Sequence, residues 1–446
     1  MTEATTTPLL EPRDGVPPVV TDEHQLQAAA DALAAGTGPV AVDAERASGY
    51  RYGQAAYLVQ LRREGSGTWL IDPVTCPDLA PVGLAIDAAE WVLHAANQDL
   101  PCLAGVGLRP TRLFDTELAA RLAGLPRVGL GAVVEQLLGL SLAKEHSAVD
   151  WSTRPLPEDW LRYAALDVEV LVDLRNALAD LLQKQGKLEW AEQEFAAIAA
   201  AAPPPPRVDP WRRTSGVHRL RSRRQLALVR ELWRARDALA RKRDVSPGRV
   251  LSDAAVVEAA SAGPRSVEEL LALPAFRGPA ARRHARLWVD AVTRGRRVAE
   301  ADLPPHSLPS DGPPPPRAWA DRDPDAAARL AIARAGLAEL SEQCQLPVEN
   351  LVTPDTVRRL MWSPPAAADL DVALAAYGAR PWQIEVAGPV LRGALAETAA
   401  TRAARARAAE LNGTRTTAVE ADGTGRAAGA ELDGTRKSAA ADAADA

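Results

Sequence analysis

Cysteine is scarce in this chain of 446 residues, which holds three: Cys76, Cys102 and Cys344. No two of them have the short spacing of a CxxC pair, which argues against a structural zinc site and against a disulfide framework. Unpaired thiols are typical of a reducing compartment, so we expect a cytoplasmic protein.

Long apolar runs are also missing, since none approaches the roughly 20 residues that a helix needs to cross a bilayer. The first residues, MTEATTTPLLEPRDG, lack a basic segment followed by an apolar stretch, so we expect neither a secretory signal nor a membrane partner. No GxxxxGK[ST] loop, GxSxG elbow or Cys/His nucleophile pattern occurs. Nucleotide-driven motors and hydrolases with a serine or cysteine nucleophile are therefore not indicated.

Charge is present but unevenly distributed. The formal net charge is −6. Residues 1–201 carry 15 basic and 28 acidic residues, whereas residues 202–297 carry 22 basic and 9 acidic residues. A basic segment beside an acidic one suits a polyanionic substrate, because one part can attract phosphate while the other holds metal. A solvated helix surface is the alternative explanation of the basic segment.

The chain divides into an α/β part and two helical parts. We expect a disordered N-terminus over residues 1–20 and an α/β domain over 21–201, in which strands at 39–45, 56–63, 67–73 and 91–96 form a mixed sheet. One long helix is expected over 157–186. Pro-rich linkers are expected at 202–219 and 301–322, around all-α bundles at 220–300 and 323–402. The two bundles have similar length and helix order and are interpreted as an internal repeat. Residues 403–446 are expected to be a low-complexity disordered tail.

Four acidic residues of the first part stand where acids are normally avoided, because they follow or interrupt apolar runs. Asp43 and Glu45 lie two residues apart on a predicted strand, so their side chains leave the same face. Asp99 follows another strand. Asp167 lies four residues after Tyr163 on a predicted helix, so these two also share a face.

Carboxylates gathered in this way predict a metal centre, because hard Mg²⁺ or Mn²⁺ prefers oxygen ligands. Two divalent ions roughly 3.5–4 Å apart would neutralise the four acids, activate a water and stabilise the leaving 3′ oxygen. A tyrosine hydroxyl ordinarily has a pKa of about 10, too high for a good base, so the expected role of Tyr163 is to orient the attacking water.

The three segments VDAE, HAANQD and YAALD resemble the exonuclease motifs of the DEDD nucleases, and the tyrosine four residues before the last acid marks the DEDDy form. The stretch KEHSAVDWSTRPLPEDWLRYAALD is similar to the ribonuclease D family. Residues 220–297 resemble an HRDC domain and residues 323–400 a more diverged second one. The resemblance covers about 380 residues and leaves out both termini.

This resemblance implies a ribonuclease H-like sheet with flanking helices and a 3′–5′ exoribonuclease that releases nucleoside 5′-monophosphates. Its implied substrates are RNAs with a 3′ extension, such as tRNA precursors and other structured RNAs. It carries over Asp43, Glu45, Asp99 and Asp167 as metal ligands and Tyr163 as the residue that positions the water. Motif I departs from the family pattern at Ala44 and at the following Arg46–Ala47–Ser48.

Further residues are candidates for RNA contact, through shape and charge rather than base readout. They are Arg51, Tyr52, Gln54, Lys144, Arg221, Arg223, Arg224, Arg241, Lys242, Arg243, Arg282 and Arg283.

Several alternatives stay open at this level. A 3′–5′ DNA exonuclease would use the same acids, and a nucleic-acid-binding scaffold with a silent site is a third interpretation. Asp115 is expected to cap a helix rather than to bind metal, and His94 to be a hydrogen-bonded core residue. Trp151 and Trp160 are expected to pack under the helix of Tyr163 rather than to stack on bases. No obligate protein partner is evident.

Overall fold

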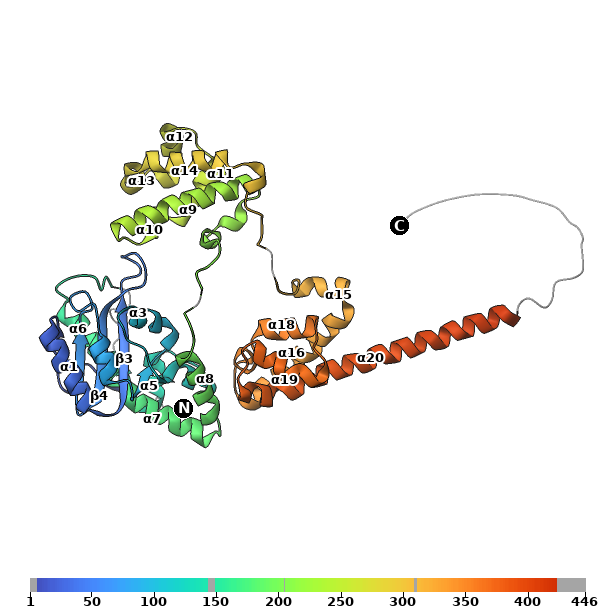
Figure 1. Cartoon of the computed structure of the whole chain (residues 1–446), viewed down its shortest axis with the longest axis horizontal. Coiled ribbons are helices and arrows are strands. Elements are labelled where there is room, and N and C mark those ends of the chain that lie inside the picture. Colours follow the sequence, from blue (N-terminus) through green and yellow to red (C-terminus); the bar gives the residue numbers. More distant parts are fainter. Residues whose placement is uncertain (1–5, 143–148, 204, 309–310, 423–446) are drawn as a thin grey trace, which may run out of the picture.

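A six-stranded mixed sheet forms the centre of the N-terminal domain in the computed structural model, which describes residues 6–142, 149–203, 205–308 and 311–422 (Figure 1). Its strands, in spatial order, are β2 (Val19–Val20), β5 (Gly67–Ile71), β4 (Ala56–Glu64), β3 (Thr37–Arg46), β6 (Glu90–Leu93) and β7 (Arg112–Asp115). β3 and β5 run antiparallel to β4 between them, whereas β6 and β7 continue the sheet in parallel.

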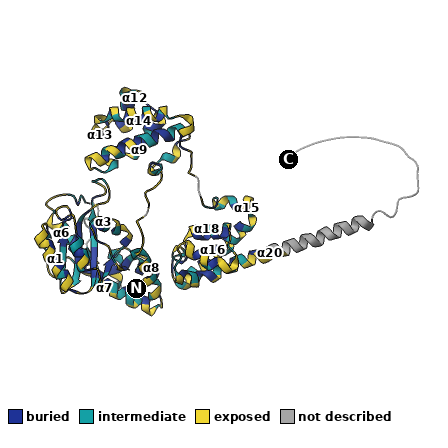
Figure 2. Cartoon of the chain, viewed as in Figure 1, coloured by how far each residue is buried: buried dark blue, intermediate teal, exposed yellow. Residues whose placement is uncertain are grey.

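Helices cover this sheet, and Figure 2 shows the strands buried between them. They are α1 (Glu23–Ala35), α2 (Ala80–Ala85), α3 (Leu100–Gly105), α4 (Thr116–Leu122), α5 (Leu130–Leu138), α6 (Glu158–Glu169), α7 (Leu171–Lys184) and α8 (Leu188–Ala199). Val40, Ala41 and Val42 of β3 are all fully buried, which requires cover on both faces and explains the continuous apolar run. The expected fold class, a mixed α/β sheet with flanking helices followed by helical parts, is confirmed.

Two expectations about this domain are wrong. Residues 6–20 are ordered, because β2 pairs with β5, and β1 (Thr7–Leu9) pairs in parallel with β8 (Leu140–Leu142). Arg13 also forms a 3.1 Å ion pair with the fully buried Glu169 carboxylate. These partners are distant in sequence, so local composition does not reveal them. The helix expected over 157–186 is divided at Val170 into α6 and α7, and both helices contact β3.

Two helical bundles follow. The first bundle contains α9 (Arg223–Arg243), α10 (Pro247–Val250), α11 (Asp253–Ala262), α12 (Val267–Ala272), α13 (Pro279–Arg283) and α14 (Ala285–Arg297). The second bundle contains α15 (Trp319–Arg322), α16 (Pro324–Cys344), α17 (Val348–Leu351), α18 (Pro354–Trp362), α19 (Leu370–Ala376) and α20 (Pro381–Asp422). Short 3₁₀ turns join these elements: η2 (Pro210–Arg213), η3 (Val217–Arg219), η4 (Pro274–Phe276), η5 (Glu300–Asp302), η6 (Pro316–Ala318) and η7 (Ala367–Asp369).

The bundles share a local plan as well as a helix order. In each, the long first helix ends at a residue with left-handed backbone, Asp244 with φ 48° and Gln345 with φ 51°. A four-residue helix follows, and the next helix begins at a side-chain N-cap, Ser252 or Thr353. The shared plan is what an internal repeat of one small bundle predicts.

Both bundles contact the N-terminal domain. In the first, the Ser246 N–H donates to the Tyr50 carbonyl at 2.9 Å, and the Arg249 guanidinium lies 4.1 Å from the Tyr50 ring centroid. In the second, Trp382 of α20 stacks on Trp190 of α8 with ring centroids 4.8 Å apart. Each bundle is thus fixed against the domain that carries the acidic residues.

α20 continues to Asp422, so the expectation of a disordered tail is wrong for residues 403–422. The segment is rich in alanine and arginine, whose intrinsic helix propensity is high. Residues 423–446 lie outside the described residues. Within the described part of the chain, no helix combines the length and the apolar character of a membrane span.

Candidate active site

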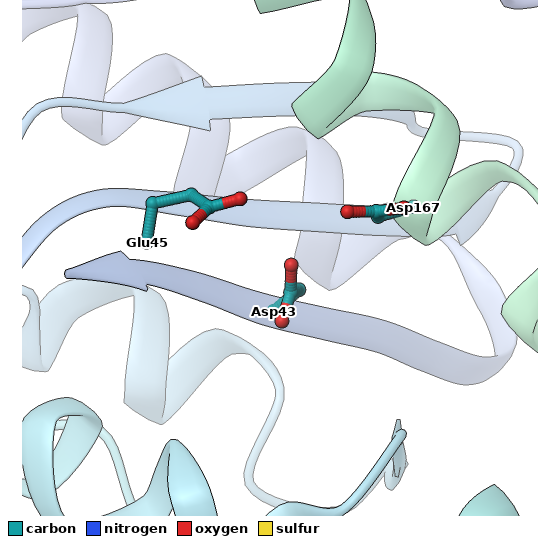
Figure 3. Close-up of side chains that lie close together, drawn as sticks. All are labelled: Asp43, Glu45 and Asp167. Atoms are coloured by element: carbon teal, nitrogen blue, oxygen red, sulfur yellow. The ribbon is translucent and has the colours of Figure 1, made fainter. Parts of the chain in front are cut away.

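Three carboxylates meet at the centre of the N-terminal domain. Asp43 and Glu45 project from β3 and Asp167 projects from α6, and one carboxylate oxygen of each lies within 4.8 Å of the others. Figure 3 shows the three side chains gathered between the strand and the helix. Their spacing on β3 directs Asp43 and Glu45 to the face that α6 covers, so a strand and a helix far apart in sequence build one cluster.

Tyr163 joins the cluster from one helical turn before Asp167. Its hydroxyl hydrogen-bonds to the Asp167 carboxylate. Burial, the negative charges of Asp167 and Glu45 and this bond raise the pKa of Tyr163 above its ordinary value. The phenol therefore stays protonated and donates a hydrogen bond to Asp167.

Asp99 lines the same cavity, which has a volume of about 540 Å³, but its carboxylate stands apart from the cluster of three. Arg46 explains this placement: its guanidinium lies 3.3 Å from Asp99 Oδ1 and donates to the Gln98 carbonyl at 2.8 Å. Sequence reasoning assigned Arg46 no role, and its only signal was a basic residue directly after the D-x-E motif.

Asp115 holds the turn that carries Asp99. Its carboxylate accepts the N–H groups of Ala95 at 3.0 Å and Ala96 at 2.9 Å, at the start of the 3₁₀ turn η1 (Ala96–Gln98). It also accepts the first N–H groups of α4, from Glu117 and Leu118. The expected capping role is confirmed, and the same side chain fixes the Asp99 turn to α4.

Burial and mutual repulsion disfavour ionisation of the four acids. Burial first, and then the charge of Asp43, raises the pKa of Glu45 to about 10 and that of Asp99 to about 8. Burial raises the pKa of Asp43 to about 6, and burial and Asp43 raise the pKa of Asp167 well above its usual range. The positive charge of Arg46 therefore offsets the repulsion among the four acids only in part.

A divalent cation fits this donor set. All the ligating atoms would be carboxylate oxygens, which suit hard cations such as Mg²⁺ and Mn²⁺. Added positive charge would also offset the repulsion that raises the pKa values of these groups. The residues that could hold it are Asp43, Glu45 and Asp167, and Asp99 lines the same cavity.

Other buried groups near the site are structural, as expected. His94 Nδ1 lies 2.9 Å from Thr116 Oγ1, and burial lowers the pKa of His94 to about 4. Trp151 is fully buried against Trp160 with ring centroids 5.5 Å apart, so it cannot stack on a base. Arg154 binds the buried Asp72 with two hydrogen bonds of 2.6 and 2.7 Å and holds the chain entering α6, a contact the sequence did not reveal.

The loop after motif I makes domain contacts where RNA contacts were predicted. The Tyr52 hydroxyl donates to Asp237 at 3.0 Å and accepts from Arg241 at 3.0 Å. Arg51 donates to Ser152 at 2.7 Å and pairs with Asp244 at 3.4 Å. Gln54 accepts from Ser48 within the loop. Arg51, Tyr52 and Arg241 therefore join the loop to the first bundle.

The predicted basic residues fall into two groups. Arg223 and Arg224 donate to carbonyl groups at and beyond the end of α14, so their guanidinium groups stabilise the first bundle. Five others are exposed: Arg221, Lys242, Arg243, Arg282 and Arg283. Arg243 lies 3.4 Å from His284, which brings the end of α9 beside the end of α13. Lys144 lies outside the described residues.

Comparison with known families agrees with this division of the chain. Residues 17–183 match the 3′–5′ exonuclease family, residues 225–292 match the HRDC domain, and residues 312–395 match a family described as the 3′ to 5′ exonuclease C-terminal domain. The last match gives the second bundle a family description other than HRDC.

Curated relatives match nearly two thirds of this chain. The ribonuclease D of Granulibacter bethesdensis is 33% identical over 293 residues, which cover 64% of this chain and 70% of the relative. The ribonuclease D of Gluconacetobacter diazotrophicus is 33% identical over 288 residues, 62% of this chain and 71% of the relative.

Solved structures show the same arrangement. A protein from Bifidobacterium adolescentis superimposes with a TM-score of 0.78 at 37% identity, covering 87% of this chain and 99% of that one. Escherichia coli RNase D, described as an exoribonuclease involved in structured RNA processing, superimposes with a TM-score of 0.62 at 26% identity, covering 85% and 98%.

Proposed function

The chain belongs to the ribonuclease D family and is a 3′–5′ exoribonuclease, and from this we propose that it trims 3′ extensions from structured RNAs, including tRNA precursors. The proposed products are nucleoside 5′-monophosphates, and the proposed cofactors are two divalent ions, Mg²⁺ or Mn²⁺. The observation that supports this most directly is the convergence of Asp43, Glu45 and Asp167 within 4.8 Å.

The acidic cluster would hold the metal. Asp43, Glu45 and Asp167 would supply ligands, and Asp99, which lines the same cavity, would supply another. Bound divalent ions would supply the charge that polarises a water and stabilises the leaving oxygen. In the hydrolysis, the water oxygen bonds to phosphorus, the bond from phosphorus to the 3′ oxygen breaks, and the 3′ oxygen gains a proton.

Tyr163 would orient the attacking water. Because burial and neighbouring carboxylates keep its hydroxyl protonated, the phenol is not the base. Its proton is directed at Asp167, which leaves the oxygen lone pairs to accept a hydrogen bond from the water.

The first bundle would hold the RNA backbone. Lys242 and Arg243 at the end of α9, with Arg282 and Arg283 of α13, form the exposed group that we name the α9–α13 basic group. The α9 end of this group adjoins the loop that follows Glu45, since the Tyr50 carbonyl accepts from Ser246. RNA phosphates bound there would lie along the route to the acidic cluster.

The test is a time course on a tRNA with a short 3′ extension and on its DNA analogue, with and without Mg²⁺. We expect Mg²⁺-dependent release of mononucleotides from the RNA. Asp43→Asn and Asp167→Asn should abolish hydrolysis while RNA binding survives, because each removes one metal ligand.

Each other result has a definite meaning. Equal digestion of the DNA would favour a 3′–5′ DNA exonuclease, because only RNA offers the 2′-OH. Binding without release of mononucleotides by the wild type would identify a silent scaffold. Hydrolysis by Asp43→Asn at the wild-type rate would reject the proposed metal centre.

A further inference from the structure

A glutamine is buried beside the acidic cluster without a hydrogen-bond partner. Gln60 of β4 is fully buried, and neither its Oε1 nor its Nε2 has a partner among the described residues. An amide buried without partners is unfavourable, because it has given up its hydrogen bonds to water. Leucine or valine would fit this strand without that cost, so packing alone does not account for a glutamine here.

The strand register places Gln60 next to Asp43. The two residues are directly opposite each other in the antiparallel β3–β4 pair, in a stretch of regular pairing. Opposite residues of such a pair have side chains on the same face, with Cβ atoms about 4.5–5.5 Å apart. The Gln60 amide therefore shares the α6-covered face with the Asp43 carboxylate.

Of the other neighbours of Gln60 on this face, Arg62 lies two residues after it on β4 and already pairs with Asp14 and Glu169, and Glu45 of β3 lies diagonally across from it. On β5 the residue paired with Gln60 is Leu70, and on β4 Leu58 lies two residues before Gln60. Both belong to an apolar cluster with Trp151, Ala164 and Ala165, under α6. Asp43 is thus the carboxylate that the register places directly opposite the amide.

Asp43 has room for such a donor. The Ala44 N–H hydrogen-bonds to its carboxylate. An ionised carboxylate can accept about four hydrogen bonds, so both metal ligation and a further donor can be accommodated. Carboxylates that bind metal are commonly held by a hydrogen bond from a neighbouring residue, which fixes their orientation.

We propose that Gln60 is a positioning residue of the metal centre, whose Nε2 donates to the Asp43 carboxylate when a divalent cation is bound. The inference rests on the proposed metal centre. With a cation bound, the Asp43 carboxylate would ligate it and would also accept a hydrogen bond from Gln60 Nε2.

The experiment compares Gln60→Leu with the wild-type full-length protein by calorimetric titration with Mn²⁺ alone and by thermal unfolding with and without Mn²⁺. Gln60→Met is the second variant, because its unbranched side chain keeps the length of glutamine. Leu61→Val is the matched control, since Leu61 is the next buried residue of β4 and its side chain faces the opposite side of the sheet.

We expect Gln60→Leu and Gln60→Met to bind Mn²⁺ about 10- to 100-fold more weakly, the usual effect of losing a partner of a metal ligand. Without metal they should unfold at the wild-type temperature or above it. Their hydrolysis at saturating Mn²⁺ should show a lower kcat with little change in KM. Leu61→Val should bind Mn²⁺ as the wild type does.

Two outcomes would overturn the inference and are distinguishable. If the wild type and the Gln60 variants bind Mn²⁺ equally, Gln60 does not position Asp43, although the metal centre stands. If the wild type itself binds no Mn²⁺, the proposed metal centre fails and the inference fails with it.

Discussion

The Arg46 guanidinium lies 3.3 Å from the Asp99 carboxylate, so an arginine is paired with a predicted metal ligand inside the acidic cavity. The Asp99 side chain is 7% exposed and that of Arg46 26%, so water screens the pair less than a surface pair. The arginine therefore supplies positive charge at the position where a cation is expected.

Replacing Arg46 should strengthen metal binding. In Arg46→Ala, Asp99 loses its competing partner and the cation loses a repelling charge. A contribution of about 1 kcal/mol corresponds to roughly fivefold tighter Mn²⁺ binding. Calorimetric titration checks this, with Arg175→Ala as the control, since Arg175 forms a comparable 2.7 Å pair with Glu90. Weaker binding by Arg46→Ala would show that the arginine supports the metal site.

Tyr163→Phe should lower kcat by roughly 10- to 100-fold, because it removes the water's acceptor together with the hydrogen bond to the charged Asp167 carboxylate, about 1.5–3 kcal/mol. KM should change less, because the phenol acts on the water rather than on the RNA. Steady-state hydrolysis of the extended tRNA measures both constants. Tyr377→Phe in the second bundle is the control, and an unchanged kcat for Tyr163→Phe would remove the hydroxyl from the mechanism.

The metal-free protein should lose stability as pH rises. Folding raises the pKa of Asp43 from 3.8 to about 6, of Asp99 from 3.8 to about 8 and of Glu45 from 4.5 to about 10. The folded state then binds more protons than the unfolded state. The contribution of these groups to the free energy of unfolding is therefore fully present below pH 3.8, and it is lost as pH rises through the folded pKa values.

Thermal unfolding with a chelator between pH 5 and pH 9 measures this loss. Glu45→Gln should flatten the dependence of Tm on pH, because it removes a carboxyl that must be deprotonated in the buried cluster. Added Mn²⁺ should raise Tm most at high pH, where the ligands are ionised. A metal-free Tm that rises steadily over this range would contradict the pKa shifts of the cluster.

Asp115→Ala should destabilise the fold and weaken metal binding together. The change removes the cap of α4 and leaves the Ala95 and Ala96 N–H groups without their acceptor. A loss of about 2–4 kcal/mol in the free energy of unfolding is expected. Asp22→Ala removes the cap of α1 and should cost about 1 kcal/mol without changing Mn²⁺ affinity. Unaltered Mn²⁺ affinity in Asp115→Ala would mean that the Asp99 turn is held by other contacts.

Neutralising the α9–α13 basic group, with glutamine at Lys242, Arg243, Arg282 and Arg283, should weaken RNA binding. For single strands, each lost phosphate contact makes the plot of the logarithm of the RNA association constant against the logarithm of salt concentration less steep by about 0.7. Four lost contacts would reduce the steepness by up to about 3. Binding titrations at several salt concentrations measure the slope. The exposed Arg317 and Arg322, changed to glutamine, provide the control. An unchanged slope would place the RNA grip elsewhere.

The acids of the cluster and Tyr163 could be found from the sequence because their signals are local. The D-x-E spacing on β3 and the four-residue spacing of Tyr163 and Asp167 on α6 each define one face of one element. The main strands and the two bundles were predictable for the same reason, since hydrophobic periodicity and prolines act over short stretches. The helix break at Val170 had no such signal.

What the sequence alone determined is therefore the set of acids, the strand and helix that carry them, and the order of the three parts. Only the tertiary structure decided which groups meet: Arg46 with Asp99, Tyr52 with Asp237, and Gln60 with the face of Asp43. It also paired two short parts of the N-terminal segment, Thr7–Leu9 and Val19–Val20, as strands. The physical reason is that strand pairing, ion pairs and domain contacts join groups separated by tens to nearly two hundred residues, and local periodicity carries no record of such partners.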